Sequence, residues 1–258
     1  MHPILNIAIR AIRKASNYLT QRYDKIDVFN QQNNFYILSN MLNISKQIII
    51  DVIHQSYPEH VIYSKNINKS SDIQWIITPL DGVTNFVKKI PHFCMALAIR
   101  IKQKTEISVV YDLMRNELFT AVRGQGAQLN GYRLRSSSVV RNINSMIMGT
   151  EYSYKKSRQQ TNAYFQLIKK MIVQCIEIRS TGSIMLDLAY VAAGRFDGYF
   201  LMGIFSIEDI SAGLLLIREA GGLVADFNGG HNYVNKNNFI AASNPFHLKS
   251  LLKFLVEN

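Results

Sequence analysis

The segment from Trp75 to Phe86 combines residue types and spacing that suit the binding of a phosphate group. An apolar run ends at Asp81-Gly82, and the hydroxyl and amide side chains of Thr84 and Asn85 follow. This pattern predicts a buried strand that opens into a turn, where glycine permits close backbone approach and successive N–H groups can hold an anion. A magnesium-dependent phosphatase would need several carboxylates there, because Mg²⁺ prefers hard oxygen ligands in octahedral geometry. The segment supplies one, Asp81.

Residues 78–86, Thr-Pro-Leu-Asp-Gly-Val-Thr-Asn-Phe, resemble the Asp-Pro-Leu/Ile-Asp-Gly-Thr-Thr-Asn-Phe signature of the inositol monophosphatase family. The likeness runs from Met1 to Tyr233 and is densest at residues 111–120, 123–135 and 186–195. It implies an α/β (α+β) fold, a five-layered α-β-α-β-α sandwich. It also implies a single domain of residues 1–258, with an N-terminal α+β half of about 1–140 and a C-terminal α/β half of about 141–258.

The resemblance assigns roles to residues of the signature, and the chain departs from the most important of them. The first Asp of the family signature is a metal ligand, but the chain has Thr78 there. The first Thr after the Gly helps to position the attacking water, but the chain has Val83, whose side chain has no oxygen. No catalytic residue is therefore expected to be intact. The remnants that the resemblance implies are metal ligands at Leu80, Asp81 and Asp209, and phosphate or substrate contacts at Leu80, Asp81, Gly82, Val83, Thr84, Arg179 and Asp209.

Other acidic positions of the family are also changed. The Glu-Glu pair that precedes the signature has no counterpart in residues 60–66, and an Asp-x-Val-Thr-x-x-Asp segment appears here with the amides Asn34 and Asn40. An amide oxygen can ligate Mg²⁺, but it cannot balance the charge of the ion. The family's Trp-Asp pair becomes Glu208-Asp209, and its inositol-contacting Glu becomes Leu201. We therefore expect the Mg²⁺ of the family to bind weakly or not at all.

The combined losses predict a pseudoenzyme. Losing two metal carboxylates, the catalytic hydroxyl and a substrate carboxylate should remove several kcal/mol of metal binding and transition-state stabilisation. At roughly tenfold per 1.4 kcal/mol, little turnover would remain.

Three functions stay open. The likeness to bacterial family members that serve as Nus factors implies a binding protein. Such a protein would join NusA and the RNA polymerase antitermination complex during ribosomal RNA transcription, as a homodimer and with direct RNA contact left open. The second function is a Mg²⁺-dependent phosphatase for inositol 1-phosphate or a related sugar phosphate, relying on Asp81, Asp209 and water. The third is a phosphate sensor in which Arg179 and the loop amides hold an anion without metal. A decayed acid cluster beside preserved turns and helices favours the first.

The charge of the chain indicates a polyanionic or acidic partner. The net charge is +11 and the pI is about 9.6, so long-range attraction to negative surfaces is expected. A bias toward AT-rich codons would also explain the abundance of Asn, Ile and Lys, and this alternative stays open. The candidate basic spots are Lys88-Lys89, Arg133 with Arg135, Lys155-Lys156 with Arg158, and Lys169-Lys170.

The composition, 48% hydrophobic and 18% charged, is typical of a folded protein. No apolar run reaches the length of about 20 residues that spans a bilayer, and no signal peptide is visible, so we expect a cytoplasmic protein without membrane contact. Cys94 and Cys175 lie far apart in apolar stretches, which predicts buried thiols in a reducing compartment.

Hydrophobic periodicity predicts helices at residues 3–22, 45–55, 160–173, 183–193, 210–220 and 245–256. Short apolar runs predict an antiparallel meander of strands at 61–63, 74–77, 95–101, 106–111 and 117–122, and further strands at 199–202, 223–227 and 238–242.

Several motifs have structural interpretations. Gly124-x-Gly126 and Gly221-Gly222 predict hairpin turns. Asp187 and Asp197 predict capping or turn roles. Asp81 has two interpretations, a residual metal ligand or a turn-stabilising Asx residue.

Overall fold

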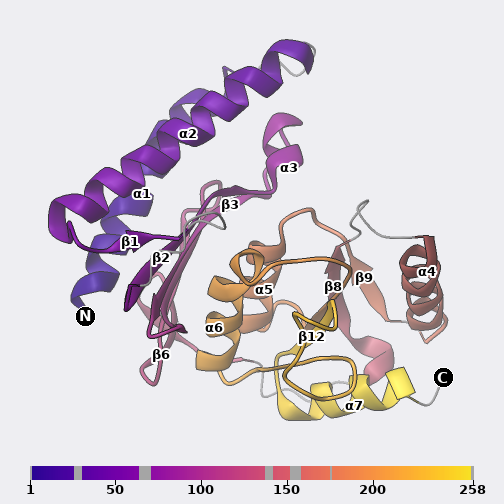
Figure 1. The fold of residues 1–258 in the computed structure, drawn as a ribbon. Coiled ribbons are helices and arrows are strands. Elements are labelled where there is room, and N and C mark those ends of the chain that lie inside the picture. The colour runs from indigo at the N-terminus through magenta and orange to yellow at the C-terminus, as the bar shows by residue number, and fades with distance from the viewer. Residues whose placement is uncertain are drawn as a thin grey trace.

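Two β-sheets and three layers of helices alternate in the order α-β-α-β-α (Figure 1). This order confirms the predicted five-layered sandwich. The computed structural model describes residues 2–25, 31–63, 71–136, 142–151, 158–174 and 176–256, without the side chains of 31–35, 158–160 and 256. The predictions made for the Asn34 side chain, residues 64–66, Lys155, Lys156 and Cys175 lie outside this description, as does the side chain of Arg158.

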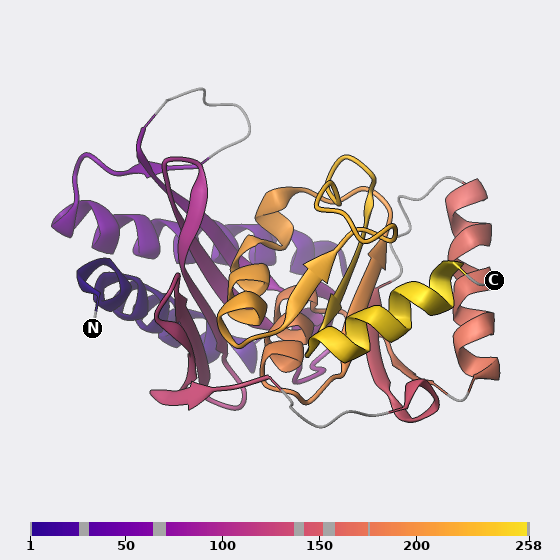
Figure 2. The ribbon, with the colours of Figure 1, turned by 90° about the horizontal axis from the view of Figure 1, so that it is seen from below.

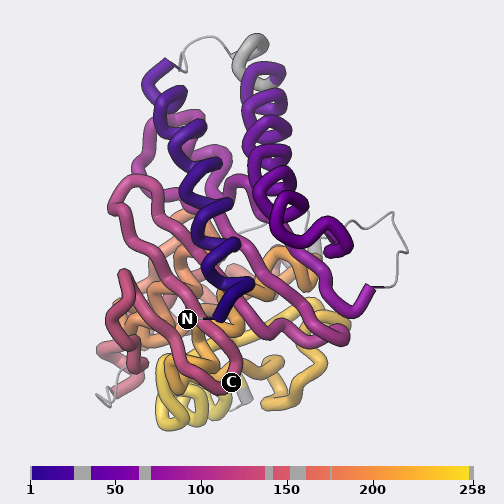
Figure 3. The backbone as a smooth tube through the Cα atoms, turned by 90° about the vertical axis from the view of Figure 1, so that its left-hand side faces the viewer, coloured from indigo at the N-terminus to yellow at the C-terminus, as the bar shows by residue number. Residues whose placement is uncertain are grey.

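Helices α1 (Pro3–Tyr23) and α2 (Gln31–Ser56) lie side by side over one face of the larger sheet (Figure 3). α1 matches its prediction, and its first N–H groups are partly satisfied by His2, whose Nδ1 accepts a hydrogen bond from the Ile4 N–H at 3.3 Å. α2 begins earlier than predicted. Its first half contains four Asn residues, and Asn is a weak helix former, so the start of the helix carries no clear signal in the sequence. Packing against the core around Leu38 and Met41 supports this segment instead.

The larger sheet has seven strands that are neighbours in sequence order. The predicted antiparallel meander is confirmed from β2 onward, but it is wrong for β1, which pairs with β2 in parallel. The turn at Gly124-x-Gly126 joins two antiparallel strands, as predicted. The strands are β1 (Val61–Ile62), β2 (Ile73–Asp81), β3 (Cys94–Ile101), β4 (Lys104–Asp112), β5 (Glu117–Val122), β6 (Gly126–Leu129) and β7 (Tyr132–Leu134).

The smaller sheet has five strands in the order β11-β12-β10-β8-β9, with β8 parallel to both of its neighbours. β8 and β9 were not predicted, because each is short and carries charged or small residues in place of an apolar run. The strands are β8 (Ile147–Glu151), β9 (Glu177–Arg179), β10 (Gly198–Met202), β11 (Leu223–Ala225) and β12 (Asn238–Ala242).

Helices α5 (Ile184–Ala192) and α6 (Ser211–Glu219) form the middle layer and contact both sheets. Residues 185–192 are all buried, which explains why this segment is apolar on every side except at Asp187. The predicted hairpin turn at Gly221-Gly222 is wrong: the Gly221 N–H bonds to the Arg218 carbonyl, so these glycines end α6.

Helices α4 (Arg158–Val173) and α7 (Pro245–Val256) cover the outer face of the smaller sheet (Figure 2). Their positions match the predicted helices. No helix in the part of the chain that the structure describes is long and apolar enough to cross a bilayer.

The end of β2 is irregular and turns sharply into the short helix α3 (Val83–Val87). The pairing register of β2 with β3 shifts between Thr78 and Asp81. Gly82 then has φ +82°, and a Cβ there would lie 3.0 Å from both the His92 carbonyl oxygen and Phe93 Cβ. The turn was predicted, whereas α3 was not, because it is only one turn and a half long.

This geometry predicts that Gly82→Ala destabilises the fold more than Gly124→Ala. Gly124 has φ +74°, and a Cβ there would meet nothing within 4 Å. We expect Gly124→Ala to lower the free energy of unfolding by about 1 kcal/mol through backbone strain, and Gly82→Ala by roughly 2–3 kcal/mol through strain and contact. Urea unfolding measures both values. Equal losses would show that the turn at Gly82 tolerates a side chain.

Candidate functional site

The Asp81 carboxylate caps the N-terminus of α5. Its Oδ2 accepts hydrogen bonds from Ser183 Oγ at 2.8 Å and from the Met185 N–H at 2.7 Å. The first N–H groups of a helix have no partner within the helix, and the helix dipole favours negative charge there. Ser183 occupies the N-cap position, but its own side chain makes no cap hydrogen bond. Asp81 therefore supplies the acceptor from a distant part of the sequence, which differs from a local Asx turn.

Burial raises the pKa of Asp81 to about 6, although the hydrogen bonds from Ser183 and Met185 oppose this rise. The negative charge of Asp187 adds to the rise. Burial also raises the pKa of Asp187, against hydrogen bonds from His92 and Thr181 that lower it. Two buried carboxyl groups near one helix end therefore make ionisation of this region unfavourable.

Asp187 holds two side chains around the signature loop. Its Oδ1 accepts a hydrogen bond of 2.7 Å from Thr181 Oγ1 and lies 3.4 Å from His92 Nε2. The other oxygen, Oδ2, has no hydrogen-bond partner among the described residues. Asp197 has a comparable role elsewhere, because its Oδ2 accepts from the Ile147 N–H at the start of β8. Both contacts are structural, but they differ from the capping or turn roles that were predicted, because their partners are a hydroxyl, a histidine and a strand N–H outside the local turn.

Asn85 joins the signature loop to the segment before α5. Its Nδ2 donates to the His92 carbonyl and to the Thr181 carbonyl, each at 2.7 Å. Asn85, His92, Thr181 and Ser183 were not among the predicted site residues. The Thr-Gly-Ser run immediately before the 184–192 helix was the available signal, since such residues often precede a helix.

The remaining residues of the signature have different surroundings. Val83 is 39% exposed and Thr84 is exposed, both in the first turn of α3. Leu80 is buried in the core beneath α1 and α2, and Thr78 pairs with Ala96 of β3.

Arg179 and Asp209 are each engaged locally. Arg179 Nη2 lies 2.5 Å from Glu177 Oε2 on the exposed strand β9. Asp209 Oδ2 accepts from both the N–H and the Oγ of Ser206 at 2.8 Å, and so caps the short 3₁₀ helix Ile207–Asp209. The structure thus brings Asp81 together with α5, while Arg179 and Asp209 bind partners close to them in sequence.

The other residues singled out in the sequence lie in the core, on α2 and beside β1. Leu201, which the resemblance aligns with an inositol-contacting Glu of the family, is 4% exposed within the core. Asn40 is exposed on α2. A hydrogen bond with Glu208 raises the pKa of Tyr63, which places Glu208 beside the end of β1. Cys94 is fully buried, as predicted, and burial raises the pKa of its thiol.

The chain matches the model of the inositol monophosphatase family over residues 1–258. It belongs to that family. It is 48% identical to proteins named Nus factor SuhB from Salmonella typhimurium and Escherichia coli, over 98% of this chain and 95% of each relative. Among solved structures, it is similar to the extragenic suppressor protein suhB of Bartonella henselae, with a TM-score of 0.85, 30% identity and full coverage of both chains. It is also similar to inositol monophosphatase from Anabaena, with a TM-score of 0.84, 26% identity, and coverage of 98% of this chain and 95% of that one. The predicted family and fold are confirmed.

The raised pKa of Asp81 predicts a specific dependence of stability on pH. The folded-state value of about 6 exceeds the ordinary 3.8, so the folded state binds this proton more tightly than the unfolded state. Ionising Asp81 therefore costs stability as the pH rises from about 4 to about 6. Asp81→Asn has no carboxyl group to ionise at this position. Between about pH 4 and pH 6, its free energy of unfolding should therefore rise relative to that of the parent by on the order of 2 kcal/mol.

Urea unfolding of both proteins at several pH values measures this difference. The substitution also changes the cap itself, which shifts the free energy of unfolding by the same amount at every pH. This shift cancels when the slopes of the free energy of unfolding against pH are compared. A difference that stays constant between pH 4 and 7 would contradict the burial of this carboxylate.

Proposed function

We propose that this protein is a binding component of transcription complexes. In this proposal it acts with NusA and RNA polymerase in antitermination of ribosomal RNA transcription, and its phosphatase site is degenerate. Near-full-length similarity to proteins named Nus factor SuhB supports the binding role. The observation that carries the proposal is the state of the signature loop: its backbone turn is kept, while its one carboxylate caps α5.

The residues present do not fit the Mg²⁺ that inositol monophosphatases use. Mg²⁺ requires several hard oxygen ligands in octahedral geometry. At the signature loop, Asp81 Oδ2 already accepts two hydrogen bonds, and Asp209 Oδ2 also accepts two. Protonation of Asp81, favoured by burial, would weaken it further as a ligand. We therefore propose that Mg²⁺ binds weakly or not at all.

The loop also lacks the group that would orient an attacking water. The side chain at position 83 is an isopropyl group, which neither donates nor accepts a hydrogen bond. Thr84 is the nearest hydroxyl in sequence, one position further along α3. Positioning of the nucleophile is a large part of catalysis, and the chain has lost it.

The binding role needs only a folded surface. The net charge of +11 attracts nucleic acid or an acidic protein over a long range. We propose a single domain of residues 1–258 that works as a homodimer in the cytoplasm. Direct contact with RNA is compatible with this role but is not required by it.

The proposal predicts that the full-length protein binds NusA in a purified mixture with RNA polymerase. Because the role assigned to the protein involves no catalytic metal, binding to NusA should be the same with Mg²⁺ and with EDTA. Asp81→Asn, which keeps an acceptor oxygen at the cap, should bind with the parent's affinity. Size-exclusion chromatography and biolayer interferometry measure these outcomes. Absence of a complex, or a complex that EDTA dissolves, would contradict the proposal.

A further inference from the structure

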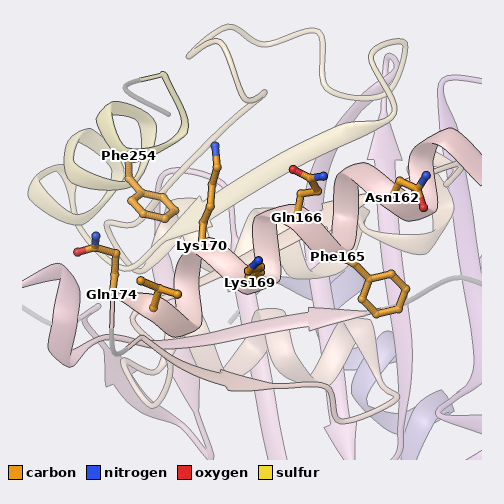
Figure 4. A pocket seen from close by; sticks show the side chains of 8 residues that line it. Asn162, Phe165, Gln166, Lys169, Lys170, Gln174 and Phe254 are labelled. Atoms are coloured by element: carbon orange, nitrogen blue, oxygen red, sulfur yellow. The ribbon is translucent and has the colours of Figure 1, made fainter.

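A groove runs between α4 and α7 on the outer face of the smaller sheet (Figure 4). Its volume is about 570 Å³, and its lining includes Phe165, Lys169, Lys170 and Val173 of α4, with Phe254 of α7. A second hollow of about 490 Å³ continues it along α7 and shares Phe254 with it. The two hollows together form an elongated depression, which we call the α4–α7 groove.

Helix α4 has two apolar faces, of which the fold uses one. Its inner face packs in the core through Tyr164, Leu167 and Met171. Outside, Phe165 is 54% exposed, Ile172 59% and Val173 71%. These three residues follow the spacing i, i+7, i+8, so they share one side of the helix. Large apolar side chains exposed on one side of a helix, beside a groove, are typical of an interaction site.

Lysines border the apolar residues. Lys169 and Lys170 line the groove from α4, and Lys253 lines its continuation along α7. None of the described residues that line either hollow is acidic. An occupant of complementary chemistry has apolar side chains on one side and carboxylates at its margins. An amphipathic helix laid in a groove between two helices has this form.

The charge pattern also distinguishes between occupants. In a two-fold contact between copies of this chain, the same patch supplies both sides, and the described lining residues of the groove include lysines but no acidic residue that could pair with them. A single-stranded nucleic acid could stack bases on the phenylalanines of the groove. Ile172 and Val173, the two most exposed apolar side chains of α4, offer no face on which a base can stack. An acidic protein segment satisfies both the apolar face and the cations.

We infer that the α4–α7 groove is the docking surface for an acidic amphipathic helix of a protein partner. The inference rests on the proposed function, because it names the surface and the partner chemistry by which the protein would join a transcription complex. Phe165 and Val173 contribute the apolar anchor, and the lysines select for acidic side chains.

The test uses the full-length protein and the NusA–RNA polymerase complex as the probe. Lys169→Glu with Lys170→Glu should weaken the affinity about tenfold or more and reduce its salt dependence. Phe165→Ala should weaken the affinity about 30-fold.

The matched controls lie on the larger sheet. They are Lys102→Glu with Lys104→Glu on the exposed β3–β4 hairpin, and Tyr132→Ala on β7, where the tyrosine is 81% exposed. Both controls should bind within about twofold of the parent.

A photo-crosslinking amino acid at position 165, compared with one at position 132, identifies the occupant. The expected product joins position 165 to an acidic segment of NusA or of RNA polymerase. If the parent binds the complex and the groove variants bind it equally well, the inference is overturned while the proposed function stands. A product with a second copy of this chain, or with RNA, would likewise overturn it. If the parent itself fails to bind, the proposed function fails and the inference fails with it.

Discussion

The hydrogen bonds between the Asp81 carboxylate and the first turn of α5 connect the large sheet to the central helices. Asp81 ends β2, and α5 packs between the two sheets. The Asn85 side chain strengthens the same junction by bonding to the carbonyls of His92 and Thr181. The relative position of the signature loop and α5 therefore depends on a few partly buried polar contacts, whose directional geometry the apolar core alone does not supply.

This constraint explains how a carboxylate can be retained where the surrounding chemistry has changed. Removing Asp81 without a replacement would leave the N–H of Met185 and the hydroxyl of Ser183 without their acceptor, at a cost of about 1–3 kcal/mol. Thr78 and Val83 have no comparable contact to preserve: Thr78 is a strand residue and Val83 is a partly exposed residue of α3. Among the described contacts, Asp81 therefore has a structural role that does not depend on catalysis.

Much of the fold could be predicted from the sequence, because long periodic segments such as 3–22 and 245–256 carry their own signal. The failures have physical causes. β8 and β9 are short and carry charged or small residues in place of an apolar run, and the sheet supplies their hydrogen-bond partners. The parallel pairing of β1 depends on the core that Trp75 and its neighbours build, and no local pattern encodes it.

Within the candidate site, the departures from the family signature at Thr78 and Val83, which replace a carboxylate and a hydroxyl respectively, were evident from residue type alone. The partners of Asp81 were not, because Ser183 and Met185 lie more than a hundred residues away in sequence. The local partners of Arg179 and Asp209 are different: Glu177 and Ser206 lie two and three residues away. The Ser206-x-x-Asp209 spacing is that of a capping box, so this contact could have been predicted from the sequence.

The most direct test of the central claim, that the family fold is kept here without its chemistry, is phosphate release from inositol 1-phosphate across a Mg²⁺ titration. Purified parent protein is compared with Asp81→Asn and with the double reversion Thr78→Asp with Val83→Thr. The account predicts that parent and Asp81→Asn release no phosphate above a protein-free control at any Mg²⁺ concentration. Mg²⁺-dependent release by the parent that Asp81→Asn abolishes would contradict it.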